Sequence, residues 1–406
     1  FSYKNMLFLT MTGRNDWFST LSPESNSVFY PSVGLSFALS DAIELPAWVT
    51  FGKVRAAWSE VGGAPLTPYR TNLAYGITGS HLGASLAGIS SSELPNRYLQ
   101  PLTVSEIEVG MDLRFLKNRL GLDIAYYDRK TTNDILSATL SESTGFETAA
   151  VNVGEMSNKG VELLLTGTPI EGPFTWDISF NYAHNVNEVI SLANGLEQLV
   201  ADESRTQRAW IQHNVGEPYS AIVGYKQQRI NGELAFGEFG GPYPLRDSVV
   251  SVLGQGVAPI TGGISNDFYF KNFNLSFLLG FQKGGSIHSG TNSLFYSAGL
   301  HKGTLAGRED GLSFTAPNAD GEYEDYFVPA DGLEDYYWVY ANWITEHIVY
   351  SSDYIKLRSF VFGYSLPDNL LEKTPFSDVN ISFVGRNLWL IYRKTENIDP
   401  ESTYNN

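Results

Sequence analysis

The sequence predicts an all-β protein of the transmembrane antiparallel β-barrel class, in which long strands run up and down across a membrane. Three observations carry this prediction. Apolar residues recur at every second position in many segments, these segments are about ten residues long, and the connections between them alternate between short and long. A period of two is that of a strand with one apolar and one polar face. A tilted strand of about ten residues is long enough to cross a bilayer.

The alternation is clearest in residues 106–115, where Ile107 and Val109 alternate with Glu106 and Glu108. A helix would not sort apolar and charged residues in this way. Similar segments give about eleven predicted strands, at 3–12, 31–40, 49–60, 106–115, 121–130, 157–168, 174–185, 263–271, 273–282, 353–365 and 379–388.

The connections between these strands are sorted by length. The short ones are 41–48, 116–120, 169–173, Asn272 and 366–378, and the long ones are 13–30, 61–105, 131–156, 186–262 and 283–352. Short periplasmic turns at one end and long extracellular loops at the other are typical of outer-membrane barrels. We therefore predict large extracellular loops near 61–105, 186–262 and 283–352.

Composition narrows the functional classes. The chain has 406 residues and a formal net charge of −17, from 27 Lys and Arg against 44 Asp and Glu. This acidity argues against a nucleic-acid partner, which requires a basic surface. Cysteine is absent, which excludes disulfides, thiolate metal sites and Cys nucleophiles. Phe1 opens directly into patterned sequence without the features of a signal peptide, so we expect a cut N-terminus.

A search for enzyme signatures is negative, and we predict no catalytic residue, cofactor or metal site. Gly254-Gln255-Gly256 lacks the third glycine of a dinucleotide-binding fingerprint, and no G-x-S-x-G or H-E-x-x-H pattern occurs. The histidines lack the spacing of zinc ligands. They are His81, His184, His213, His288, His301 and His347.

Several segments resemble the barrel of SusC/RagA-type TonB-dependent outer-membrane transporters, and the match runs in order along nearly the whole chain. The resemblance rests on Phe29–Phe37 (FYPSVGLSF), Lys53–Gly62 (KVRAAWSEVG), Glu106–Phe115 (EIEVGMDLRF), Asn118–Tyr127 (NRLGLDIAYY), Asn158–Glu162 (NKGVE), Thr261–Ile264 (TGGI), Asp353–Arg358 (DYIKLR), Gly385–Leu388 (GRNL) and Asn397–Glu401 (NIDPE).

The resemblance implies a barrel of about 22 strands around a plug, of which this chain would supply about half as a C-terminal portion. The plug, the segment engaged by the TonB complex and the final strand would then lie outside this sequence. Further implications are residence in the outer-membrane lipid of a Gram-negative cell, a SusD-like surface lipoprotein as a lid, and active import of a glycan or peptide cargo. A glycan-binding or adhesion β-protein without transport activity, secreted or in the outer membrane, is the alternative function.

One loop segment is unusual in composition. Residues 309–355 hold eleven carboxylates and eleven aromatic residues but no Lys or Arg. Aromatic rings beside carboxylates suit contact with a sugar or with a partner protein, whereas a packed structural loop is a second interpretation. A third is Ca²⁺ bound near Asp320-Gly321-Glu322, although the spacing is not that of an EF-hand. The candidate cargo or lid contacts are Tyr323, Tyr326, Tyr336, Tyr337, Trp338, Glu324, Asp325 and Asp335.

Overall fold

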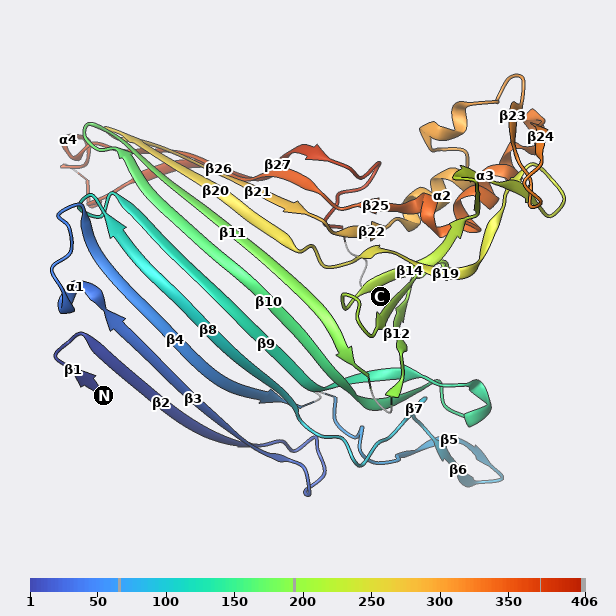
Figure 1. Cartoon of the computed structure of the whole chain (residues 1–406), viewed down its shortest axis with the longest axis horizontal. Helices are drawn as coiled ribbons and strands as arrows, with labels where there is room; N and C mark the ends of the chain where they lie inside the picture. Colours follow the sequence, from blue (N-terminus) through green and yellow to red (C-terminus); the bar gives the residue numbers. More distant parts are fainter. Residues whose placement is uncertain (65–66, 193–194, 373, 403–406) are drawn as a thin grey trace.

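The computed structural model describes residues 1–64, 67–192, 195–372 and 374–402, and one large antiparallel sheet dominates it (Figure 1). In this described part, eleven long strands follow one another across the sheet in chain order. They are β2 (Leu7–Trp17), β3 (Ser27–Ala38), β4 (Val49–Gly63), β8 (Leu102–Phe115), β9 (Leu120–Thr139), β10 (Thr148–Ile170), β11 (Phe174–Ser191), β20 (Ile260–Phe270), β21 (Phe273–Lys283), β26 (Tyr354–Ser365) and β27 (Asn380–Arg393).

The all-β fold class is confirmed, and each of the eleven predicted segments contributes to one of these strands. The first segment was placed wrongly at 3–12. Lys4 and Asn5 adopt positive φ angles of 48° and 53°, so the chain turns there. The short strand β1 (Ser2–Tyr3) consequently folds back on β2 and forms one outer edge of the described sheet, opposite β27.

Strands β9 and β10 are far longer than predicted, with 20 and 23 residues. Most of segment 131–156, predicted as a loop, continues their hairpin instead. Next to this extension, Lys159 Nζ lies 3.2 Å from an Asp128 carboxylate oxygen, on the face that carries Val161 and Leu163 further along β10. The appearance of an ion pair on this face marks where its apolar stretch ends.

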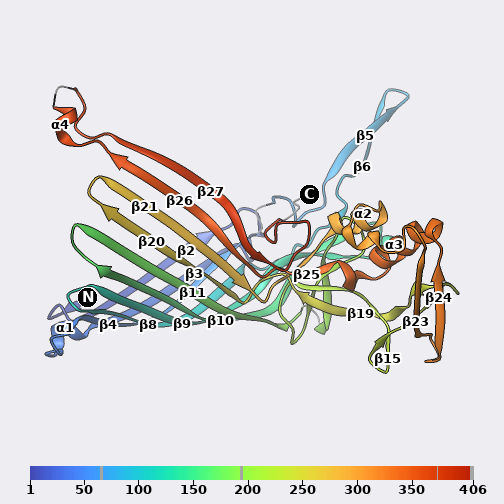
Figure 2. The ribbon, with the colours of Figure 1, turned by 90° about the horizontal axis from the view of Figure 1, so that it is seen from above.

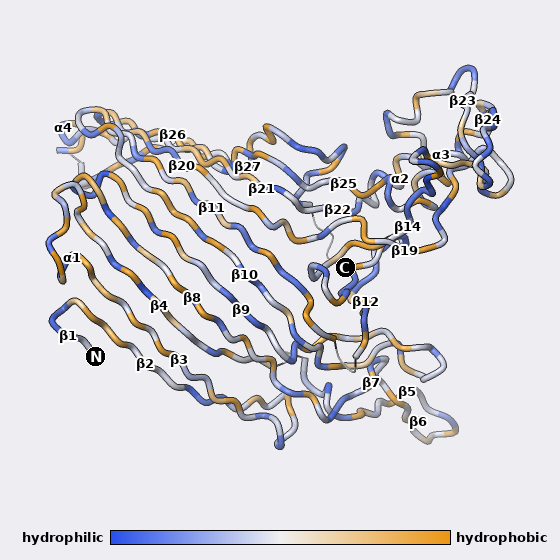
Figure 3. Tube along the Cα trace, in the orientation of Figure 1, coloured by the Kyte–Doolittle hydropathy of each residue, from blue (hydrophilic) through white to orange (hydrophobic). Residues whose placement is uncertain are grey.

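The two faces of the sheet differ in polarity, as the alternating colours along the strands in Figure 3 show. On β8, Ile107 and Val109 lie on one face and are 56% and 46% exposed, although both are large apolar residues. Glu106 and Glu108 point to the opposite face. Such an exposed apolar face is what strands in contact with lipid require. In Figure 2, the sheet curves so that β26 and β27 turn away from the plane of β4 to β10.

Tight turns and stacked aromatic rings collect at one end of the sheet. Trp48 stacks on Phe115 with ring centroids 5.6 Å apart, and Trp176 stacks on Phe268 at 5.8 Å. Aromatic rings of this kind form girdles where a barrel meets the membrane surface. The short helices α1 (Leu39–Ala42) and α4 (Asp368–Leu371) lie at this same end (Figure 1).

The long connections extend from the opposite end (Figures 1 and 2). Between β4 and β8 lie the hairpin of β5 (Tyr75–His81) and β6 (Ala84–Ile89) and the short strand β7 (Glu93–Leu94), which pairs with β10. None of the helices in the described ranges is long and apolar enough to cross a membrane.

The remaining elements belong to the connections that follow β11 and β21. They are β12 (Gln198–Glu203), β13 (Trp210–Asn214), β14 (Ala221–Gln227), β15 (Arg229–Ile230), β16 (Glu233–Leu234), β17 (Phe236–Glu238), β18 (Tyr243–Pro244), β19 (Arg246–Gln255), β22 (Ser286–His288), α2 (Gly290–Ser297), β23 (Leu312–Pro317), β24 (Tyr323–Val328), α3 (Leu333–Asn342) and β25 (Val349–Ser351). Short 3₁₀ helices are η1 (Glu142–Thr144), η3 (Lys302–Leu305), η4 (Ala330–Gly332) and η5 (Thr345–Ile348).

Candidate functional site

Two long connections fold together into one unit at the loop end of the sheet, which we call the loop module and define as residues 195–259 and 284–353. The first connection forms a four-stranded sheet in the order β12-β13-β14-β19, and the second supplies α2, α3 and η5. The module therefore brings together residues more than a hundred positions apart in the sequence, such as Tyr225 and Thr345.

Thr345 of η5 fastens the two connections to each other. Its hydroxyl accepts a hydrogen bond from the Tyr225 backbone N–H at 3.0 Å and donates one to the Arg208 carbonyl at 2.6 Å. At Gly224, an added Cβ would lie 2.5 Å from the Thr345 Cβ, closer than two such atoms can approach. Glycine is thus required where β14 crosses η5.

A partly exposed polar network reinforces the same junction. The Arg229 guanidinium pairs with Glu346 at 2.9 Å, and His347 Nε2 lies 3.1 Å from the Gln227 side-chain oxygen. Burial lowers the pKa of His347 to about 4, so the ring is neutral near pH 7. Nδ1 of His347 lies 2.8 Å from the Tyr340 carbonyl oxygen, so the single N–H of the neutral imidazole can donate to that carbonyl and hold the ring in place.

Two of the eight candidate contact residues lie in the interior of the loop module. Tyr336 and Tyr337 are buried in a cluster with Val328 and Leu333. The Tyr337 hydroxyl donates hydrogen bonds to backbone carbonyls of the η3 segment at 3.0 and 3.2 Å. The second interpretation, a packed structural loop, therefore describes these two rings, because neither is accessible to cargo or lid.

The other six candidates lie nearer the surface. Tyr326 is half-buried against Phe236 and Phe314, with ring centroids 6.0 and 5.5 Å away. The carboxylates of the hairpin bond locally: Glu324 accepts from the Asn318 amide and Asp325 from the Thr315 hydroxyl, both at 2.7 Å. The exposed candidates, whose contact role stays a prediction, are Tyr323, Glu324, Asp325, Asp335 and Trp338.

Within the described ranges, no group of three or more His, Asp or Glu side chains converges as a metal site. The Ca²⁺ interpretation of the acidic segment thus has no cluster of ligands to rest on there and stays a prediction.

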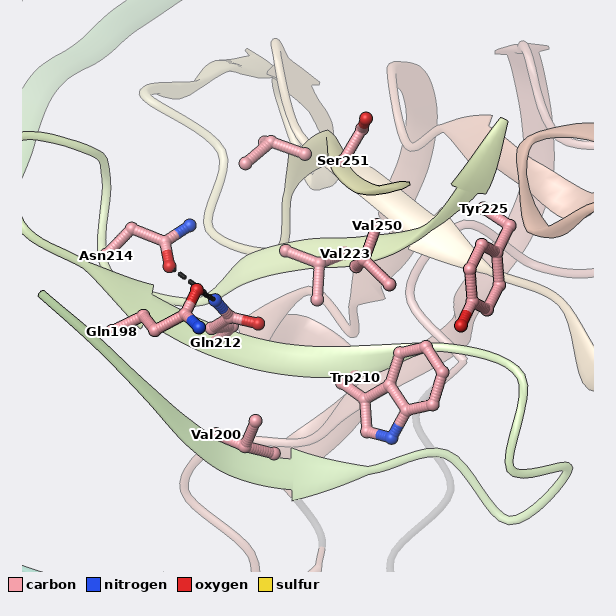
Figure 4. Close-up of a pocket in the computed structure, with 10 residues that line it drawn as sticks. Gln198, Val200, Trp210, Gln212, Asn214, Val223, Tyr225, Val250 and Ser251 are labelled. Carbon is pink, nitrogen blue, oxygen red and sulfur yellow. Dashed lines mark hydrogen bonds between the residues drawn. The ribbon is translucent and has the colours of Figure 1, made fainter. Parts of the chain in front are cut away.

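The four-stranded sheet of the loop module is hollowed on one face (Figure 4). The hollow has a volume of about 420 Å³, within the size range of small-molecule sites. It is lined by Gln198, Val200, Trp210, Gln212, Asn214, Val223, Tyr225, Val250, Ser251 and Val252. None of the eight predicted contact residues is among the described residues that line it.

The opposite face of this small sheet is covered. Leu199 of β12 packs in a cluster with Met156 of β10, Val189 of β11 and Leu192, which directly follows β11. Because side chains alternate across a strand, Leu199 points away from the hollow while its neighbours Gln198 and Val200 line it. The hollow is therefore carried on a sheet that is anchored to the barrel wall.

Aromatic rings form one end of the hollow. Trp210 and Tyr225 meet edge to face, with ring centroids 6.2 Å apart. The Trp210 indole N–H donates to a Glu203 carboxylate oxygen at 2.9 Å, which fixes the plane of the ring. The Arg246 guanidinium lies between the rings of Tyr225 and Trp343, 4.1 and 3.8 Å from their centroids.

Side-chain amides form the other end of the hollow. The Gln212 Nε2 group donates to the Gln198 oxygen at 2.8 Å and to the Asn214 oxygen at 2.6 Å, as the dashed line in Figure 4 illustrates for two of these residues. Sequence reasoning did not identify these residues. The alternation in Trp210–Asn214 could have indicated a strand, but not which strands pair beside it.

Several charged side chains on the polar face of the large sheet are paired with one another. Arg55 of β4 donates to Glu108 at 3.1 Å and, through two guanidinium nitrogens, to Asp123 at 3.0 and 2.9 Å. Arg129 pairs with Glu106 in the same way. These contacts link neighbouring strands and satisfy charges that would otherwise need a partner.

The segment after β27 folds back onto the wall. Lys356 on β26 bonds to Asp399 at 2.7 Å and to Glu401 at 3.0 Å, and the Arg358 guanidinium also binds Glu401. On its other side the segment reaches the loop module, where Asn292 of α2 donates to the Glu396 carbonyl at 2.8 Å. We call residues 394–402 the strap, because they connect β26 with the loop module.

Comparison with known proteins identifies the relatives of this chain. The family model described as "TonB dependent receptor-like, beta-barrel" matches residues 1–243. TonB-dependent receptor P3 of Formosa agariphila is 26% identical and aligns with 100% of this chain and 41% of its own length. TonB-dependent receptor SusC of Bacteroides thetaiotaomicron is 24% identical, over 99% of this chain and 40% of its own. The chain thus spans about two fifths of the length of these relatives.

Solved structures show the same fold. The RagAB peptide transporter superposes with a TM-score of 0.77 at 19% identity, covering 98% of this chain and 43% of the transporter chain. The RagAB peptide importer in its "closed-closed" state gives a TM-score of 0.76 at 18% identity, over 96% and 42% of the two chains. The loop module is included in this likeness, since the alignment extends over almost every residue.

Proposed function

Because the chain belongs to the family of TonB-dependent receptor-like β-barrels, we propose that its protein imports a nutrient across the outer membrane by TonB-dependent active transport. The cargo is an oligosaccharide or a peptide. The protein is accordingly a transporter and not an enzyme, and this chain contributes part of the barrel wall and extracellular loops.

The observation that carries this proposal is the asymmetry of the sheet. One face is apolar and exposed, the other is polar and carries ion pairs between strands, and within the described residues the loop module lies at one end. A wall between lipid and an aqueous interior explains the two faces. A role of this end in binding cargo explains why the long connections are folded and carry a hollow.

The proposed partner is the one that the resemblance to SusC/RagA-type transporters implies, a SusD-like surface lipoprotein that covers the extracellular end as a lid. The similarity to SusC and to the RagAB transporter supports that resemblance. Exposed residues of the loop module, such as Tyr323 and Trp338, are our candidates for the lid contact. The plug and the site engaged by the TonB complex would lie in parts of the protein outside this sequence, since the chain spans 41% of its relative P3.

Uptake measurements in living cells test the proposal. Cells of the source organism that carry the intact gene, a deletion of the gene, or the intact gene with TonB disrupted are given radiolabelled oligosaccharides and peptides. We expect one cargo class to enter only when both the gene and TonB are present. Affinity purification of the full-length protein from membranes should also recover a lipoprotein of the SusD type.

The alternative function makes a different prediction in the same experiment. An adhesion or glycan-binding protein without transport activity would bind cargo at the cell surface to the same extent with and without TonB, and no label would enter the periplasm. Uptake that is unchanged by deletion of the gene would also exclude the import proposal.

A further inference from the structure

We propose that the hollow on the four-stranded sheet of the loop module binds an uncharged oligosaccharide. This inference rests on the proposed import function, because it identifies the class of cargo recognised on the extracellular side. It concerns residues of β12, β13, β14 and β19, none of which was among the candidate contacts found in the sequence.

The aromatic end of the hollow suits the apolar face of a sugar ring. The Trp210 indole is held in plane by its hydrogen bond to Glu203, and the edge-to-face contact with Tyr225 closes one side. A fixed flat ring offers contact area without the entropic cost of ordering a mobile side chain. Val223 and Val250 extend this apolar surface into the hollow.

The amide end suits the hydroxyl groups of the same ligand. Gln212 uses both N–H donors on Gln198 and Asn214, which leaves the Gln212 oxygen and the N–H₂ groups of Gln198 and Asn214 without another hydrogen bond among the described residues. An amide oxygen accepts and an amide nitrogen donates. Because a sugar hydroxyl does both, a row of alternating donors and acceptors matches vicinal hydroxyls.

Charge separates a sugar from a peptide as the occupant. Of the described residues that line the hollow, none carries an acidic or basic group. Two charged groups beside the aromatic end have partners of their own, Glu203 the Trp210 indole and Arg246 the rings of Tyr225 and Trp343. A charged group placed in the hollow would meet no opposite charge among these lining residues. An uncharged ligand needs none.

The sheet that carries the hollow is also supported from behind. It is fixed by the Leu199 cluster and by the Thr345 hydroxyl on the Tyr225 backbone. A pre-formed surface binds with less reorganisation than a mobile loop. The position at the loop end places the bound oligosaccharide outside the barrel, where a lid could enclose it.

Binding to the purified full-length protein in detergent tests the inference. Isothermal titration calorimetry would compare uncharged hexasaccharides of glucose, mannose, xylose and galactose with an alginate hexamer and a hexapeptide of alanine and serine. We expect an uncharged hexasaccharide to bind, and Trp210→Ala to weaken binding by about tenfold or more, which is about 1.4 kcal/mol. Trp210→Phe, which keeps a stacking ring, should retain most of the affinity.

Two further variants keep the result interpretable. Gln198→Ala removes an amide from the surface of the hollow, and we expect it to weaken the same ligand without unfolding the module. Trp17→Ala removes a Trp that is 69% exposed on β2, outside the loop module, and serves as the matched control with unchanged binding. Circular dichroism and melting curves confirm that each variant is folded.

Each outcome decides the inference separately from the import function. Preference for the hexapeptide or the alginate hexamer, binding of no uncharged sugar, or equal affinity of Trp210→Ala, Gln198→Ala and the wild type would overturn it. Uptake assays on the same variants separate the two proposals. TonB-dependent uptake that persists unchanged in Trp210→Ala would reject the hollow while the transporter stands, whereas loss of all TonB dependence in the wild type would reject the transporter itself.

Discussion

Arg358 on β26 binds Glu401 in the strap, with one guanidinium nitrogen 2.6 Å from a carboxylate oxygen. The two residues are 43 positions apart, yet their contact fastens the chain after β27 onto the polar face of the sheet. The Tyr354 hydroxyl donates to the same carboxylate at 2.8 Å. Lys356 also donates to this carboxylate, so Glu401 accepts hydrogen bonds from three side chains of β26.

The attachment of the strap to β26 should depend on the pH of the solution. Burial alone would raise the pKa of Glu401, but hydrogen bonds from Arg358, Lys356 and Tyr354 together lower it to about 2. A lowered carboxyl pKa stabilises the folded state above the unfolded value near 4.5 and loses this contribution as the pH falls towards 2. We expect hydrogen exchange in residues 394–402 of the full-length protein to be slow at pH 5 and to rise, after correction for intrinsic rates, near pH 2.5. Glu401→Gln should show fast exchange at both values, and equal protection of the variant and the wild type at pH 5 would contradict this account.

The crossing of β14 and η5 should not tolerate a side chain at position 224. Gly224→Ala would place a methyl group 2.5 Å from the Thr345 Cβ, so one of the two segments must move. We expect a loss of about 1–3 kcal/mol in the stability of the loop module, the usual range for overpacking. Gly34→Ala on β3 is the matched control, because an added Cβ there meets no atom within 4 Å. Limited proteolysis of the two variants would show early cleavage within residues 195–259 only for Gly224→Ala.

The sequence was sufficient to predict the large sheet because the residues of each strand alternate between an apolar and a polar face. In β8, the alternation of Ile107 and Val109 with Glu106 and Glu108 reports lipid on one side and polar neighbours on the other, and this pattern needs no knowledge of distant residues. The error at 3–12 arose because the turn at Lys4 and Asn5 has no glycine or proline to mark it. The extension of β9 and β10 was missed because it lacks the period of two: Ile135 and Leu136 are adjacent apolar residues, and each packs in a different cluster.

The candidate site was harder to predict because its residues meet only in the folded loop module. The acidic and aromatic composition of 309–355 drew attention to Tyr336 and Tyr337, yet composition does not distinguish a ring that packs inside from one that faces a partner. The hollow depends on the pairing of β12 with β13 and of β14 with β19. Those pairings follow from long-range packing on Met156 and Thr345, which no local pattern around Trp210 reports.

The connection between β4 and β8 should be held by a second charge cluster. Arg70 lies between Glu93 and Ser137, with its guanidinium 2.5 Å from Glu93 and 2.6 Å from the Ser137 hydroxyl. The hydrogen bond from Arg70 lowers the pKa of Glu93, so the pair is charged at neutral pH. We expect Glu93→Gln to speed hydrogen exchange in residues 69–94 by about tenfold, because local opening no longer has to break the ion pair. Glu24→Gln, which alters an exposed pair with Arg97, should leave this exchange unchanged.

Mutations of the exposed and of the buried aromatic residues of the acidic segment should have different effects: the buried residues should affect stability and the exposed ones lid association. Tyr337→Phe removes a hydroxyl that bonds to two carbonyls of η3, and we expect it to lower stability by about 1 kcal/mol without directly affecting lid association. Tyr323→Ala and Trp338→Ala remove rings that are 58% and 42% exposed, so stability should be unchanged within about 0.5 kcal/mol. If these rings contact the lid, the two exposed variants should recover less SusD-like lipoprotein when the full-length protein is purified from membranes. Full recovery with both variants would place the lid contact elsewhere on the loop end, whereas loss with Tyr337→Phe alone would show that the interior packing of the module, and not its exposed rings, controls the association.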